Sequence, residues 1–264
     1  MKDIGFDRPD ASHSLAEATF VIAFAGELEG HRMENLHTVG DELSRDFSKR
    51  SPNQAVNLSV SQGKAESSAS FNGWTLENVD HESGLVRWQL AIERSRLIIK
   101  CLEYPRWGHF KEKIMSWLGV IQAHLSLEEW PVKEVGTLFT DRFYWSLKGE
   151  EYRLDKLFEL DSDYLSPNIK NRGPLWHLFQ GWIETENNRE FLHNLNLSTQ
   201  WDINKPHKTE VLHIVRCLKG KDREFDGLNL ELVSEALEKA HEDNKKMLNK
   251  LLSAETIEFI GLNS

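Results

Sequence analysis

Several features that identify common protein classes are scarce or missing in this sequence of 264 residues. It has two cysteines, Cys101 and Cys217, and each lies in an apolar run, so we expect buried thiols and no disulfide. No apolar run approaches the roughly 18 residues of a membrane helix, and no apolar segment follows a basic start. We therefore expect a cytoplasmic protein without membrane association.

Positive charge and sequence motifs for catalysis are also lacking. The net charge is −10, so the chain as a whole lacks the positive charge that favours nucleic-acid binding, although a local basic patch remains an alternative. Neither a dinucleotide fingerprint, a GxxxxGK[ST] loop nor a GxSxG elbow is present. His241 and Glu242 begin like a zinc-protease motif, but Lys245 stands where the second histidine is needed. We expect no catalytic residue, no metal and no cofactor.

Apolar periodicity predicts an α+β fold, with mostly antiparallel sheet in two loosely related halves, packed helices and a long C-terminal helix. Strands are expected at 15–24, 55–60, 73–79, 84–93, 96–104, 132–145, 175–184, 190–201 and 209–220. Helices are expected at 33–47, 106–125 and 229–252, with a shorter helix from Ser253. Ser-Pro-Asn at 51–53 is expected to break regular secondary structure. The small polar segment 61–70 is typical of a mobile loop.

Three segments follow from this pattern. Residues 1–14 are polar and are expected to be flexible. Residues 15–130 form the expected N-terminal α+β half, and residues 131–264 form the C-terminal half with the terminal helices. The order of strands and helices is similar in the two halves, which suggests a loose duplication.

The segment TDRFYW at 140–145 is the first candidate for a binding site. Strand alternation places Arg142 and Tyr144 on one side, and Asp141 with the neighbouring aromatic residues on the other. Arg beside Tyr can bind a carboxylate or phosphate. The alternative is an internal salt bridge that fixes the end of the strand.

Histidines supply the other candidates. His193 and His213 lie on neighbouring predicted strands and can share one face, but a metal would need further ligands. The nearest acids in sequence, Asp202 and Glu210, lie at strand ends, so packing of both histidines within the sheet is favoured. His241 borders the apolar stripe of the C-terminal helix, where a structural role and a ligand or partner contact are the two interpretations.

The chain also resembles a sporadically distributed bacterial family of similar length whose function is uncharacterised. The resemblance is carried by LAEATFVIAF (15–24), by YPRWGHF (104–110) after a Trp strand and hairpin, and by the closing helix ALEKAHEDNKKMLNKLLSAE. One strand departs from the family, which has Leu-Arg-Tyr-Ile-Asn-Arg there. This chain has Leu138-Phe139-Thr140-Asp141 instead, and Arg142 stands at the position of the second Arg of the family motif. The resemblance implies a bacterial protein of patchy inheritance, as in mobile defence cassettes, and supplies no catalytic residues.

The leading functional hypothesis is a non-enzymatic recognition protein. We expect it to bind a partner protein from the same gene neighbourhood, as an accessory, antitoxin or immunity component of a defence-type module. A small-ligand or nucleotide sensor with a pocket between the halves, near Arg142, Tyr144 and His193, is the first alternative. A hydrolase of nucleic acid or nucleotides is the second.

Overall fold

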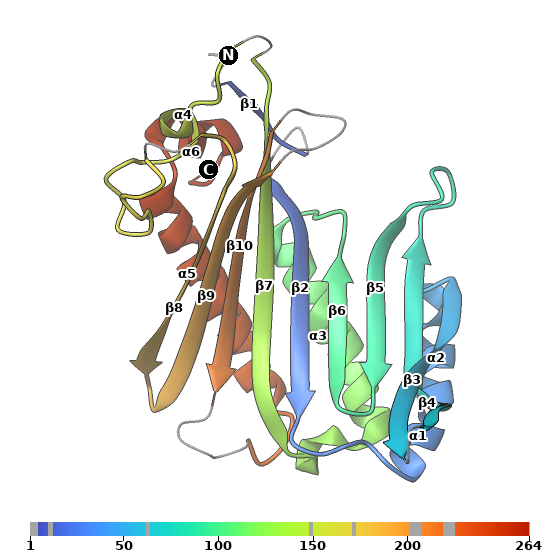
Figure 1. Ribbon diagram of the computed structural model, residues 1–264. Helices are drawn as coiled ribbons and strands as arrows, with labels where there is room; N and C mark the ends of the chain where they lie inside the picture. The colour runs from blue at the N-terminus through green and yellow to red at the C-terminus, as the bar shows by residue number, and fades with distance from the viewer. Residues whose placement is uncertain are drawn as a thin grey trace. The chain divides into compact units, whose positions relative to one another are not determined.

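The computed structural model describes residues 5–9, 13–61, 64–147, 150–170, 173–200, 207–218 and 225–263 (Figure 1). The fold is α+β, as predicted. The strands are β1 (Phe6–Asp7), β2 (Leu15–Phe24), β3 (Lys49–Ser61), β4 (Lys64–Val79), β5 (Val86–Glu93), β6 (Arg96–Cys101), β7 (Val132–Trp145), β8 (Trp176–Glu186), β9 (Arg189–Gln200) and β10 (Lys208–Leu218). The helices are α1 (His31–Glu34), α2 (Leu36–Glu42), α3 (Trp107–Leu125), α4 (Leu154–Leu157), α5 (Leu230–Leu251) and α6 (Ala254–Ile260), with short 3-10 turns η1 (Leu43–Arg45) and η2 (Leu127–Glu129).

The chain divides into two compact units, and each is assembled from separate segments. Unit 1 comprises Met1–Ala18, Gly136–Cys217 and Ala236–Ser264, and unit 2 comprises Thr19–Val135 and Leu218–Glu235. The predicted division between residues 130 and 131 therefore differs from the division by contacts. The reason is that β2, β7 and α5 each contribute residues to both units, so no single point in the sequence separates them.

Unit 2 has the strand order β3-β4-β5-β6-β2, and α3 supplies much of its core. Five apolar residues spaced three or four apart on this helix are all buried: Phe110, Ile114, Trp117, Ile121 and Leu125. Trp117 packs edge-on against Trp88 of β5, with ring centroids 5.1 Å apart. Its indole Nε1 donates to Asp46 Oδ2 at 3.0 Å, so the buried polar atom of this large side chain is satisfied.

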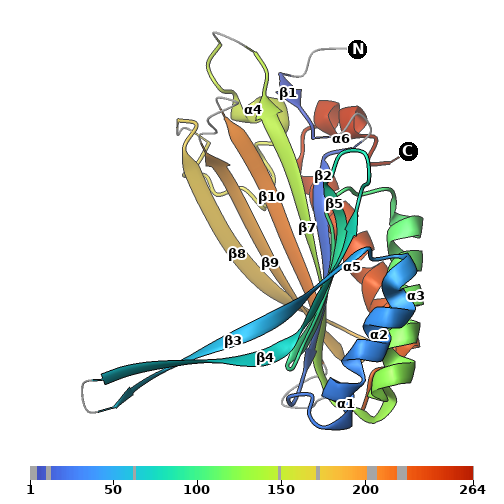
Figure 2. The same cartoon turned by 90° about the vertical axis from the view of Figure 1, so that its right-hand side faces the viewer.

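Three expectations for unit 2 differ from the structure. The expected breaker at 51–53 lies within β3, and residues 64–70 of the expected loop lie in β4, because β3 and β4 pair with one another from Lys49↔Glu77 to Ser61↔Lys64. β3 is the last strand in the order, and Pro is tolerated on an edge strand where its missing N–H faces no partner. β5 pairs with β4 only over Gly73–Val79, so the remainder of β3 and β4 is a two-stranded ribbon (Figure 2). The helix expected at 33–47 is divided into α1, α2 and η1.

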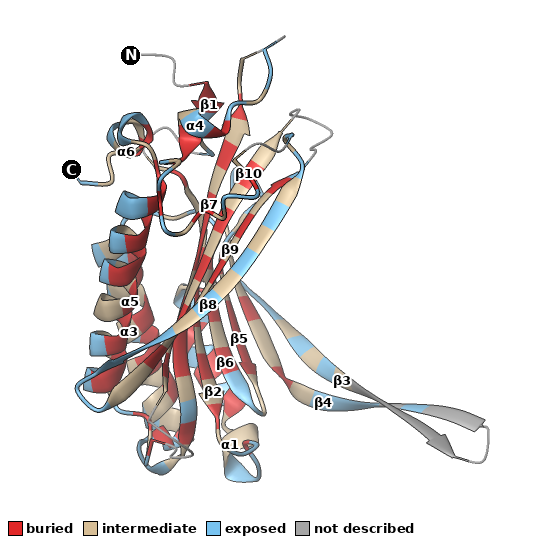
Figure 3. Cartoon of the chain, turned by 60° about the vertical axis from the view of Figure 1, so that its left-hand side comes forward, coloured by how far each residue is buried: buried red, intermediate tan, exposed pale blue. Residues whose placement is uncertain are grey.

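Unit 1 has the strand order β7-β10-β9-β8, and β1 pairs with β7. Phe6 of β1 is buried and lies opposite Trp145 of β7, and the flexibility expected for residues 1–14 stays a prediction. The buried face of α5 packs in one apolar cluster with residues of the sheet (Figure 3). The cluster includes Phe143, Leu195, Leu197, Val211, Met247, Leu248 and Leu251. Among the described residues, no helix combines the length and the apolarity that crossing a bilayer requires.

Gly73 provides a test of the β4–β5 pairing. Its φ is +145°, and a Cβ added there would lie 1.9 Å from the backbone oxygen of Ile92 on β5. We expect Gly73→Ala to lower the free energy of unfolding by about 2 kcal/mol or more, since backbone would have to move. Gly119→Ala is the matched control, because Gly119 lies in α3 with nothing within 4 Å of its added Cβ. Denaturant unfolding of both variants measures the difference, and equal stabilities would contradict the close approach.

Candidate functional site

The predicted strand site at 140–145 has the expected alternation, and its arginine forms an internal salt bridge. Asp141 is buried while Arg142 and Tyr144 are half-buried on the other face of β7. Arg142 Nε donates to Glu210 Oε1 of β10 at 2.7 Å. Lys208 Nζ lies 3.5 Å from the same oxygen. Arg142 thus forms an internal salt bridge within unit 1, and its role in binding stays a prediction.

Asp141 is held in an apolar environment by a single hydrogen bond. Ser14 Oγ donates to its Oδ1 at 2.6 Å, and its Oδ2 is buried without a partner among the described residues. Burial raises the pKa of Asp141 to about 6, and the hydrogen bond from Ser14 offsets only part of this effect. The carboxylate is therefore a source of instability at neutral pH.

A second group of polar residues lies between the sheet of unit 1 and α5. His193 of β9 and His213 of β10 are each 1% exposed, and the predicted sharing of one face is confirmed. His193 Nδ1 lies 3.2 Å from His213 Nε2, and His213 Nδ1 lies 3.1 Å from Asn244 Oδ1 of α5. With the Asn244 oxygen as acceptor, His213 donates from Nδ1 and accepts at Nε2 from His193. Neutral His193 then presents the lone pair of Nε2.

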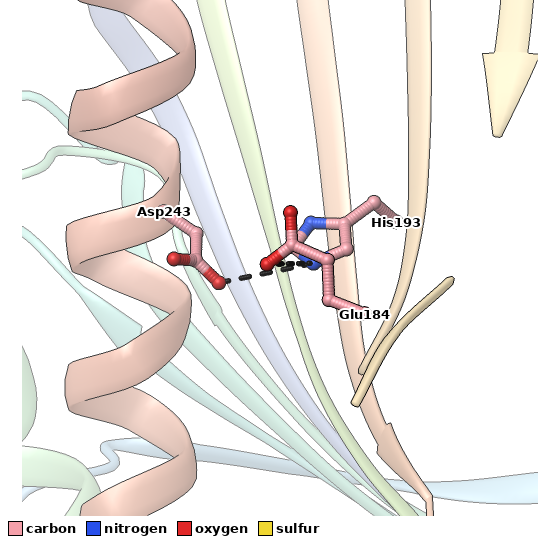
Figure 4. Close-up of side chains that lie close together, drawn as sticks. All are labelled: Glu184, His193 and Asp243. Atoms are coloured by element: carbon pink, nitrogen blue, oxygen red, sulfur yellow. Dashed lines mark ion pairs between the residues drawn. The ribbon is translucent and has the colours of Figure 1, made fainter. Parts of the chain in front are cut away.

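That lone pair faces two carboxylates from two other elements (Figure 4). His193 Nε2 lies 3.8 Å from Glu184 Oε2 of β8 and 3.8 Å from Asp243 Oδ2 of α5. Both distances exceed a hydrogen bond, and Nε2 is buried without a hydrogen-bond partner among the described residues. One donor atom from each of the three residues lies within 4.8 Å of the other two. This group is called the His193 cluster below.

Lys239 supplies a positive charge at the same place. Its Nζ lies 2.6 and 2.7 Å from the two carboxylate oxygens of Asp243, and 3.6 Å from Glu184 Oε2. Burial lowers the pKa of Lys239, but the hydrogen bonds and charge of Asp243 raise it by more. The ammonium therefore stays protonated at neutral pH and balances one of the two carboxylates.

Burial is the largest influence on the protonation state of the two imidazoles. Burial lowers the pKa of His213 to about 4, and the hydrogen bond to Asn244 opposes this shift. Burial likewise lowers the pKa of His193, although the charges of Glu184 and Asp243 oppose it. The Trp182 indole stacks on the His193 ring at 4.9 Å and an angle of 1°. Both histidines are thus neutral at pH 7, as ligands and hydrogen-bond relays require.

Glu184 is oriented by the same tryptophan. Trp182 Nε1 donates to its Oε1 at 3.2 Å, which leaves Oε2 directed at the His193 cluster. Burial raises the pKa of Glu184, but the bond from Trp182 and the charges of His193 and Lys239 lower it by more. Glu184 is thus ionised at neutral pH.

The structure does not bring the sequence candidates into one site. Arg142 and Tyr144 lie on the face of the unit 1 sheet opposite Phe143, whereas His193 lies on the face of Phe143 that packs against α5. His241 is half-buried, with its ring 6.5 Å from that of Phe139, and burial lowers its pKa to about 4. Of the acids considered near the histidines, Glu210 pairs with Arg142, and Asp202 lies outside the described residues.

Strand β8 provides a different kind of candidate site on its outer face. Leu175, Phe179 and Ile183 are exposed by 65%, 62% and 59%, and they recur every four residues. Exposed and intermediate positions follow one another along β8 (Figure 3). β8 pairs with β9 from Trp176↔Thr199 to Glu186↔Arg189 without a register shift. It is the terminal strand of the order, so its other edge has no strand neighbour among the described residues. The side chains and the edge together form the β8 surface.

Comparisons with known proteins provide no family. No family model and no curated protein matches the chain. Among solved structures, the chain is similar to the crystal structure of the di-domain ARO/CYC BexL from the BE-7585A biosynthetic pathway, with 10% identity over 88% of this chain and 95% of that chain. The TM-score of 0.19 is too low for that likeness to bear on fold or function.

Asp141 generates a prediction about pH. Its pKa is about 6 in the folded protein and near 3.8 as an ordinary aspartate, so the unfolded state loses its proton first as pH rises. This group therefore lowers stability progressively from about pH 4 to pH 6, and the loss persists above that range. We expect Asp141→Asn to gain roughly 2–3 kcal/mol relative to wild type between pH 4 and pH 7.

Denaturant unfolding at a series of pH values measures this gain. Asp161→Asn is the control, because Asp161 is exposed and its weak ion pair with Lys170 spans 3.4 Å. A difference between wild type and Asp141→Asn that stays constant with pH would contradict the raised pKa.

Proposed function

We propose that this protein is a recognition protein whose β8 surface binds an extended apolar segment of a partner protein. The observation that carries the proposal is the combination of exposed apolar side chains on β8 and a β8 edge that has no strand neighbour among the described residues. A partner strand that adds to such an edge gains backbone hydrogen bonds, and alternate side chains supply specificity. This proposal keeps the leading hypothesis from the sequence and names a surface for it.

The contrast between two edge strands supports this role. Natural edge strands are commonly protected by Pro, Lys or bulges that prevent pairing with other chains. β3 has Pro52, Lys49 and a register shift between Asn53 and Gln54. β8, with the sequence WHLFQGWIETE, has no Pro, no Lys and no register shift. The edge that lacks protection is also the one that carries exposed Phe179 and Ile183.

Charge favours a basic partner. The chain has a net charge of −10, and β8 ends in Glu184-Thr185-Glu186. Complementary potentials raise association rates and disfavour acidic competitors. The partner segment is therefore expected to be apolar along its strand, with basic residues near the end that meets Glu186. The role as an antitoxin, immunity or accessory component of a defence-type module is proposed on the family resemblance alone.

A pair of substitutions on β8 tests the proposal. Phe179→Thr with Ile183→Thr keeps strand propensity and removes the exposed apolar groups. We expect the affinity for the partner, identified by affinity capture and then purified, to fall on the order of 10- to 100-fold in calorimetry. In the wild-type complex, hydrogen exchange at backbone amides on the open edge of β8 should slow.

Leu85→Thr is the matched control, because Leu85 is 68% exposed and lies in unit 2 away from β8 in sequence. Unchanged affinity in the double variant, or unchanged exchange in β8, would overturn the proposal. A concentration-dependent dimer in sedimentation velocity that the double variant abolishes would identify a second copy as the occupant and would overturn it as well.

A further inference from the structure

We infer that the His193 cluster is a binding site for a divalent transition-metal ion, with Glu184, His193 and Asp243 as its protein ligands. The donors come from β8, β9 and α5, and all lie within unit 1. Neither the sequence motifs nor the comparisons assign such a site. The inference does not depend on the proposed partner, because these side chains point to the face of β8 opposite Phe179 and Ile183.

The first step of the argument is the orphaned imidazole nitrogen. His193 is 1% exposed, and its Nε2 has no hydrogen-bond partner among the described residues. A buried polar atom without a partner costs roughly 1–3 kcal/mol, so native structures seldom keep one without a reason. This nitrogen points at two carboxylate oxygens, each 3.8 Å away, which are acceptors and cannot donate to it. A cation among the three atoms satisfies all of them.

The second step is the support behind the ligands. A histidine that binds a metal usually donates its other ring N–H to a fixed acceptor, which sets the tautomer and the orientation of the ring. Here His193 Nδ1 is bonded to His213, which is bonded to Asn244. Trp182 holds one oxygen of Glu184 and stacks on the His193 ring. Two of the three ligands are therefore oriented by independent contacts.

The third step is the spacing and identity of the donors. Ligands lie about 2.0–2.2 Å from zinc, so donors in a tetrahedron are roughly 3.4 Å apart. The two His193 distances of 3.8 Å require an inward movement of a few tenths of an ångström. One imidazole with two carboxylates suits first-row divalent ions such as Zn²⁺ or Mn²⁺ better than Ca²⁺ or Mg²⁺, which prefer oxygen alone.

Lys239 is the internal competitor for this site. Its ammonium bonds both oxygens of Asp243 and also lies 3.3 Å from Glu186 Oε2. A metal ion that binds Asp243 displaces the ammonium, and Glu186 offers it an alternative carboxylate. Metal affinity is therefore expected to be lower than for a site without a resident positive charge, and removal of Lys239 should raise it.

Calorimetric titration of the full chain with Zn²⁺, followed by metal analysis after dialysis, tests the site. We expect one equivalent to bind. Glu184→Gln and Asp243→Asn should each lower the affinity about tenfold or more, since each removes one anionic ligand. Lys239→Met should raise it about tenfold or more, because the competing charge is gone. Glu184 is half exposed, so its variant is expected to fold normally.

Glu186→Gln is the matched control, because Glu186 lies on β8 and pairs with Lys239 but contributes no donor to the cluster. Its affinity should stay within about twofold of wild type or fall slightly, because the displaced Lys239 ammonium loses its alternative carboxylate. Absence of Zn²⁺ binding, or binding that Glu184→Gln and Asp243→Asn leave unchanged, would overturn the inference. Binding that appears only in Lys239→Met would also overturn it, because Lys239 would then be the permanent cation of the cluster.

Discussion

The hydrogen-bonded chain from His193 through His213 to Asn244 is the constraint on which the arrangement of unit 1 depends. Its members are almost fully buried between the sheet and α5, in contact with an apolar cluster. Each imidazole leaves water at a cost that only a well-aligned partner offsets. A helix that slid by one residue along the sheet would keep much of its apolar contact but would lose the bond from His213 to Asn244. This chain of hydrogen bonds therefore fixes the register of α5 against β9 and β10.

The same register determines which charges face His193. Lys239 and Asp243 are four residues apart and share one helical face, and Asn244 is the next residue around the helix. Once Asn244 is fixed on His213, Asp243 is placed beside His193 and Lys239 beside Glu184. A cluster of carboxylates and a lone-pair nitrogen is thus a consequence of satisfying a buried histidine pair. The register of α5 thus determines both the His193 cluster and the packing of this helix on the sheet.

Much of this arrangement follows from sequence periodicity, and the missing parts are non-local. Alternation along β9 puts His193 on the side of the buried Leu195 and Leu197, and the stripe of buried residues on α5, at Leu237, Ala240 and Leu248, includes Asn244. Asp243 lies three residues after Ala240 of that stripe, so the spacing itself could have shown that it is buried. Glu184 was not predictable, because its role depends on the pairing of β8 with β9 and on a helix far along the chain.

In the β3–β4 ribbon, the composition predicts a loop where the structure has paired strands. Its Ser, Ala and Asn residues have weak strand propensity, and the composition is typical of a loop. Pairing between the two strands overrides that preference, and register in such a segment is set by the partner strand more than by apolar alternation. His241 was selected from sequence because of its motif-like neighbour, yet the residues two and three positions later make the contacts with the histidine pair.

The two faces of β8 carry different kinds of side chain. Successive side chains of a strand point in opposite directions, so Trp182 and Glu184 face α5 while Phe179 and Ile183 face outward. An edge with exposed apolar groups favours association with other strands, including those of identical chains. The charge of −10 opposes contact between identical copies, because like charges repel as they approach. Under the proposed function, a basic partner would remove that repulsion and cover the apolar groups, so the same charge would disfavour self-association and favour a basic partner.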